Sequence, residues 1–190
     1  NMIRQIPISR LFLLFILVPL MGSRNAGSAK MLTGKTYSLL FFISDAQSDW
    51  LPIEKQQLLQ QVTDAELWLV EEAKKYNQDV EFEHGFFGWE QDIELNALPD
   101  GTRSGTEDVY LTNKIIQKLG YTNQQQLINQ ISAHNIQLLF LFKKDGISYA
   151  FPYSENVDDE FYLEGMSIYH RFDPKTPQCT ACIAHEMLHI

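Results

Sequence analysis

The stretch TYSLLFFIS, residues Thr36 to Ser44, is a short run of apolar and strand-favouring residues with few polar interruptions. A run of this length is typical of an interior strand with both faces covered, because a buried helix is normally longer. Val80 to Phe87 (VEFEHGFF) predicts a second strand, since its apolar residues and His84 alternate with Glu81 and Glu83. Helices should therefore cover a sheet built around these strands.

A long amphipathic helix is predicted between the two strands, from Leu51 to Tyr76. Pro52 stands near its start, where the missing N–H costs nothing. We interpret its glutamines and charged residues as a solvated face. A strand, a helix and a strand in this order predict a right-handed parallel crossover. The apolar residues at helical spacing are Leu58, Val62, Leu69, Ala73 and Tyr76.

The next fifty residues are expected to form a loop and two helices. Residues 88–107 contain Pro99 and several glycines without a clean period, which predicts a long surface loop. Helical patterns follow over residues 108–119 and 123–132, with Gly120 as the expected C-terminal cap of the first and Thr122 as the N-cap of the second.

Two or three further strands and a last helix complete the expected domain. Ile136 to Phe142 is another buried run, and the Asp-Gly pair at 145–146 predicts a tight hairpin back along it. Pro152 should keep the returning strand at or near an edge of the sheet. Gly165 to Arg171 predicts one more strand, and Thr176-Pro177 should open the final helix.

Residues 1–29 are expected to be a secretory signal rather than part of the domain; an uncleaved membrane anchor is the alternative. Arg4 and Arg10 precede eleven apolar residues, Leu11 to Met21, and small residues lead up to Ala29. Eleven residues are too few to cross a bilayer, which takes about 20. We therefore expect no stable membrane span after cleavage, and a secreted, periplasmic or cell-surface protein.

The acidic charge of the chain excludes one class of partner. Loss of residues 1–29 removes three arginines and no acids, so the formal charge changes from −9 to −12. Nucleic acid is then a poor partner, because binding to phosphates requires a basic surface.

The strongest functional signal lies in CTACIAHEMLHI, residues 179–190, where three polar residues interrupt an apolar helix pattern. His185 and His189 are four apart, so both imidazoles lie on one helix face and can reach a single zinc ion. Glu186 is rotated by about 100° from His185, which suits contact with a water held by the metal. A bound metal would also offset the cost of burying these polar groups. We assign His185 and His189 as metal ligands and Glu186 as general base.

The His-Glu-x-x-His motif in an apolar helix resembles the zincin metallopeptidases. The order strand, long helix, strands and active-site helix is most similar to their metzincin branch. The resemblance implies an α/β (α+β) fold with a mixed, mainly parallel twisted sheet, a long crossover helix and an active-site helix. It also implies peptide-bond hydrolysis with Zn²⁺ as cofactor, a peptide or protein substrate held extended on an edge strand, and residues 30–190 as the N-terminal part of the catalytic domain.

The third zinc ligand of the family pattern would fall five positions beyond Ile190. We therefore expect the sequence to be incomplete at its C-terminus, and residues up to Ile190 alone to bind metal weakly or not at all. His84, His134 and His170 are candidate substitutes within the sequence, although each is better explained as an ordinary histidine.

Two other functions remain open. Cys179 and Cys182 form a C-x-x-C pair, which in an exported chain can be a disulfide or a redox centre. The chain can also be a secreted binding protein that keeps a protease-like scaffold without turnover. The sequence leaves the peptide preference, a propeptide and the oligomeric state undetermined.

Overall fold

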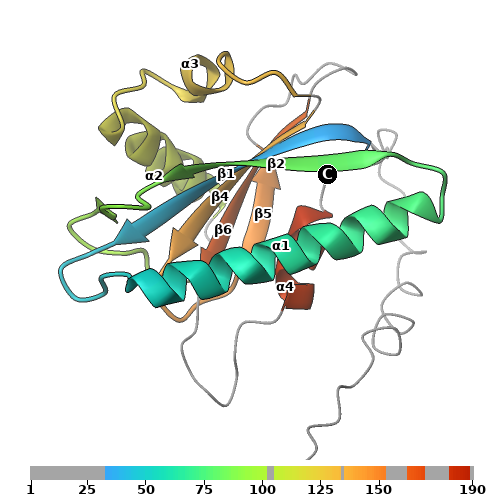
Figure 1. The fold of residues 1–190 in the computed structure, drawn as a ribbon. Helices are drawn as coiled ribbons and strands as arrows, with labels where there is room; N and C mark the ends of the chain where they lie inside the picture. The colour runs from blue at the N-terminus through green and yellow to red at the C-terminus, as the bar shows by residue number, and fades with distance from the viewer. Residues whose placement is uncertain (1–32, 102–104, 134, 153–161, 170–179, 189–190) are drawn as a thin grey trace, which may run out of the picture. The chain divides into compact units, whose positions relative to one another are not determined.

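The computed structural model describes residues 33–101, 105–133, 135–152, 162–169 and 180–188 (Figure 1). The expected signal, residues 1–29, lies outside this part, and none of the described helices is long and apolar enough to cross a membrane. The described strands are β1 (Gly34–Ser44), β2 (Val80–Phe87), β3 (Ile93–Glu94), β4 (Asn135–Phe142), β5 (Tyr149–Pro152) and β6 (Tyr162–Tyr169). The described helices are α1 (Pro52–Lys74), α2 (Gly105–Lys118), α3 (Gln124–Ile128) and α4 (Thr180–Met187).

The described strands form one mainly parallel sheet in the order β2-β1-β4-β6-β5, with the short β3 paired to the end of β1. β1 is parallel to both β2 and β4, and β4 is parallel to β6. The predicted parallel crossover from β1 through α1 to β2 is therefore confirmed, as is the mixed α/β class of the fold. β5 contains Pro152, is antiparallel and lies at the end of the described order. This position agrees with the one expected for the strand that contains this proline.

The predicted hairpin at residues 143–146 is wrong. β5 does not pair with β4, because β6 lies between them and pairs with both. Gly146 packs against the ring of Tyr169 in β6, and the amide of Ile147 donates to the carbonyl of Gly101. The Asp-Gly pair therefore lies in a wider connection held by distant contacts.

Helices cover both faces of the sheet, and each face has its own apolar core (Figure 1). Leu39, Phe41 and Ile43 of β1 face the core formed with α2 and α3. Leu40 and Phe42 face the core formed with α1 and α4. This division explains why the centre of the stretch, Leu39 to Ile43, is apolar at every position: alternate side chains of β1 enter two different cores.

The solvated face predicted for α1 is wrong at two positions. Lys55 and Glu66 are buried, at 4% and 3% exposure, because each side chain has polar partners from elsewhere in the chain. The expected apolar positions Leu58, Val62 and Leu69 do pack in the core, whereas Tyr76 lies beyond the helix end and is exposed.

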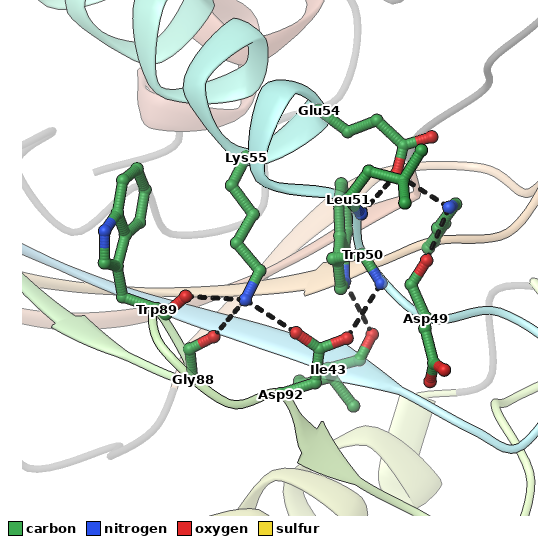
Figure 2. A network of polar contacts seen from close by, with 10 residues as sticks. Ile43, Asp49, Trp50, Leu51, Glu54, Lys55, Gly88, Trp89 and Asp92 are labelled. Carbon is green, nitrogen blue, oxygen red and sulfur yellow. Dashed lines mark hydrogen bonds and ion pairs between the residues drawn. The ribbon is translucent and has the colours of Figure 1, made fainter.

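Lys55 ties the start of α1 to the segment between β2 and β3 (Figure 2). Its Nζ donates to the carbonyls of Gly88 at 2.5 Å and Trp89 at 2.8 Å, and it lies 2.6 Å from Oδ1 of Asp92. Asp92 in turn accepts a 2.8 Å hydrogen bond from the amide of Trp50. The expected loop over residues 88–107 is therefore anchored at its start and contains β3.

The α2–α3 region differs from expectation mainly in its boundaries. Gly120 has a φ of +93°, as expected for a glycine after a helix end. The N-cap of α3 is Asn123, whose side chain accepts from the amide of Gln126, and not Thr122. α3 also ends at Ile128, four residues before the predicted end.

Candidate active site on the last helix

α4 carries the predicted site and packs on the same sheet face as α1. It lies chiefly against α1 and also contacts β5 and β6. Ile183, Ala184 and Met187 are buried in the core, as the apolar pattern predicted. Leu188 is 45% exposed, so the expectation that nearly the whole circumference is buried is wrong there. α4 therefore has an outer side on which a polar side chain can reach solvent.

Two of the three predicted site residues lie in the described part of α4. The side chain of His185 is exposed, whereas Glu186 is buried at 8% exposure. His189 lies outside the described residues, so the convergence of the two imidazoles on one ion stays a prediction. The imidazole of His185 suits zinc chemically and is accessible, but the described residues contain no group of three side chains able to hold a metal ion.

Glu164 is a second buried carboxyl beside Glu186 that the sequence analysis missed. It lies on β6 at 2% exposure, and burial together with the charge of Glu186 raises the pKa of Glu164 to about 8. The available signal was a glutamate one residue before a predicted apolar strand, but strand ends commonly carry polar residues. Only the longer strand and the position of α4 over it show that this carboxyl is buried.

His84 is paired with Glu66 of α1. Its Nε2 lies 2.6 Å from Oε2 of Glu66, whose Oε1 accepts a 3.0 Å hydrogen bond from Ser38. His84 is on β2, three strands from Glu164 on β6, and three strand spacings amount to about 14 Å. His84 is therefore engaged by Glu66, as expected for an ordinary histidine; His134 and His170 lie outside the described residues.

The pairing with Glu66 predicts a pH-dependent stability. The hydrogen bond to Glu66 raises the pKa of His84 above the 6.5 of an unperturbed histidine, against the opposing effect of burial. This contribution is fully present below pH 6.5 and is lost as the pH rises through the raised pKa. We expect the free energy of unfolding to fall over this interval, measured by urea denaturation at a series of pH values.

Two variants test this assignment. His84→Gln keeps a donor for Glu66 but does not titrate, and Glu66→Gln removes the negative partner. Both should flatten the decline in stability above pH 6.5. An unchanged slope in His84→Gln would assign the pH dependence to another group.

Of the C-x-x-C pair, only Cys182 lies in the described part, on an exposed position of α4. Cys179 lies outside it, so the disulfide and redox interpretations stay predictions.

No protein-family model, no curated protein and no solved structure matches this chain. The resemblance to zincins therefore depends on the motif residues and on the order of the elements.

Proposed function

We propose that the protein is an exported zinc-dependent endopeptidase of the zincin type, with α4 as its active-site helix. The observation that carries this proposal is the position of the motif. α4 holds an exposed His185 next to a buried Glu186 and lies beside β5, the antiparallel strand at the end of the described sheet. The order strand, long helix, strands and active-site helix supports the metzincin branch.

β5 suits the binding of an extended peptide. Within the described residues its sheet pairing is with β6, and it is the end strand of the described order. A peptide added as a further strand gains main-chain hydrogen bonds that do not depend on its sequence. A substrate at this edge would lie next to α4, because α4 contacts β5.

The residues of the His-Glu-x-x-His motif would have separate catalytic roles. His185 and His189 would hold zinc through their imidazole nitrogens, and the ion when bound would polarise the scissile carbonyl and the attacking water. Glu186 would accept the proton of the water and pass it to the leaving amine. The burial of Glu186 supports this role, because packing in the core fixes the direction in which a side chain points.

The test is zinc content together with peptide cleavage, measured on the full-length product of the gene. We expect bound zinc and hydrolysis of mixed fluorogenic peptides in the wild type. His185→Ala should weaken zinc binding more than about 100-fold, because it removes a direct ligand. The matched control is His84→Gln, a histidine engaged by Glu66, which should leave zinc content and cleavage unchanged.

Each other outcome selects a different function. Stoichiometric zinc without hydrolysis of any peptide would favour a binding protein on a protease-like scaffold. Absence of zinc, with reduction of a disulfide by Cys179 and Cys182, would favour the redox function. Zinc binding that survives His185→Ala would refute the site on α4.

A further inference from the structure

One polar row crosses the sheet face that α1 and α4 cover. Its members are neighbours in register: Ser38 of β1 is paired with His84 of β2 and with Gln137 of β4, and Gln137 is paired with Glu164 of β6. The matching row two residues further along these strands is entirely apolar, and consists of Phe86, Leu40, Leu139 and Met166. A polar row inside an apolar core requires internal hydrogen bonds, because each unpaired buried group costs about 1 to 3 kcal/mol.

The half of the row under α1 is closed by Glu66. This carboxylate accepts from Ser38 at 3.0 Å and lies 2.6 Å from His84. The hydroxyl of Ser38 and the ring nitrogen of His84 are therefore both paired with this carboxylate.

In the half of the row under α4, the hydrogen bonds of Gln137 and Glu164 remain incomplete if Glu164 is an ordinary ionised carboxylate. The Nε2 of Gln137 donates to the carbonyl of Met187 at 3.1 Å, which ties the end of α4 to the centre of the sheet. Within the described residues, Oε1 of Gln137 and Oε2 of Glu164 are buried without a hydrogen-bond partner. These two oxygens belong to side chains on adjacent strands, at paired positions of one sheet face.

One proton on Glu164 satisfies both oxygens. Two acceptors cannot bond to each other, but a carboxylic acid is a donor and an amide oxygen accepts from it. The surroundings favour the neutral acid, since Glu164 is 2% exposed and the charged group that acts on it is the carboxylate of Glu186 from α4. Neutral pH lies below the pKa of about 8 that these two effects produce.

We propose that Glu164 is a buried neutral acid whose O–H donates to Oε1 of Gln137, and that the two residues position the turn of α4 that carries Glu186. The inference depends on the proposed function only for the role of that turn. Met187 directly follows Glu186 and stands two residues before His189, so its tether to Gln137 fixes the rotation and depth of α4 against the sheet. Glu164 in turn holds the amide of Gln137 in the orientation that presents Nε2 to α4.

The first test observes the acid directly, in the full chain. The infrared carbonyl band of a protonated carboxylic acid should be present at pH 7, where ordinary carboxylates are ionised, and it should disappear in Glu164→Gln. Absence of this band in the wild type would overturn the proposal.

The second test compares variants by their ability to donate. Glu164→Gln keeps a donor and should keep the wild-type properties within about twofold. Glu164→Met and Gln137→Met break the relay, by which we mean the hydrogen bonds from Glu164 to Gln137 and from Gln137 to the carbonyl of Met187. Each methionine variant should increase the hydrogen-exchange rates of the α4 amides about tenfold. Each should also lower kcat about 10- to 100-fold with little change in KM, as for the loss of other groups that orient catalytic residues. Glu164→Asp, too short to reach Gln137, serves if a methionine variant fails to fold.

The outcomes separate the two proposals. If the wild type neither binds zinc nor cleaves peptides, the peptidase proposal fails while the infrared and exchange measurements still decide the relay. If Glu164→Gln is as impaired as Glu164→Met, or if Glu164→Met exchanges at the wild-type rate, the relay is refuted whatever the activity.

Discussion

Glu186→Gln is expected to lower kcat for peptide hydrolysis about 10³- to 10⁴-fold and to leave the zinc content unchanged. The amide has the size of the carboxylate but cannot take a proton from water, and loss of a general base has effects of this order. His185 and His189 are untouched, so the ligands of the ion that we propose remain. The measurements are kcat and KM on a fluorogenic peptide, and metal content of the purified variant.

Two further observations make this experiment specific. Glu71→Gln is the matched control, because it makes the same change on an exposed position of α1 and should have no effect. Glu186→Gln should not destabilise the fold, since the amide has the size of the carboxylate and an uncharged group is less costly to bury at this position. A variant that folds, binds zinc and retains full activity would refute Glu186 as general base.

Lys55→Met is expected to lower the free energy of unfolding by about 3 to 5 kcal/mol, the usual cost of removing one partner of a buried ion pair. Methionine fills the space of the lysine chain but leaves the carbonyls of Gly88 and Trp89 without their donor and removes the cation 2.6 Å from Asp92 (Figure 2). Urea denaturation measures the change. Lys75→Met, at the exposed end of α1, is the matched control and should change stability by less than about 0.5 kcal/mol.

A double variant separates loss of the pair from loss of packing. Lys55→Met combined with Asp92→Leu removes both charges, so it should recover part of the stability lost in Lys55→Met alone. A loss below about 1 kcal/mol in Lys55→Met would show that the network in Figure 2 contributes little to stability.

The strands and the long helix could be predicted from the sequence because their signals are local. The side-chain period is about two in a strand and 3.6 in a helix, so the pattern in Thr36 to Ser44 or in Leu58, Val62 and Leu69 depends only on which residues must face a core. The same reasoning placed His185 and Glu186 on a helix. It also predicted β5 at an edge, since Pro152 cannot donate to a neighbouring strand.

The errors concern residues whose partners are far away in the chain. The Asp-Gly pair predicted a hairpin, but the choice of β6 as the neighbour of β4 and β5 depends on strand pairing beyond the turn. The sequence favoured an ordinary histidine at position 84, but only the structure shows that its partner is Glu66. The polar row could not be predicted, because nothing in the local sequences of Ser38, Gln137 and Glu164 shows that they align with one another across the sheet.

The sequence by itself determined the strand and helix segments, the parallel crossover and the placement of the His-Glu-x-x-His motif on an apolar helix, because backbone geometry imposes these periods on neighbouring residues. Only the tertiary structure decided which polar side chains are buried and which groups they contact. Lys55 meets Gly88 across 33 residues and Glu66 meets Ser38 across 28. A charged or polar group is stable in a core only when a partner is supplied there, and that partner comes from another part of the chain.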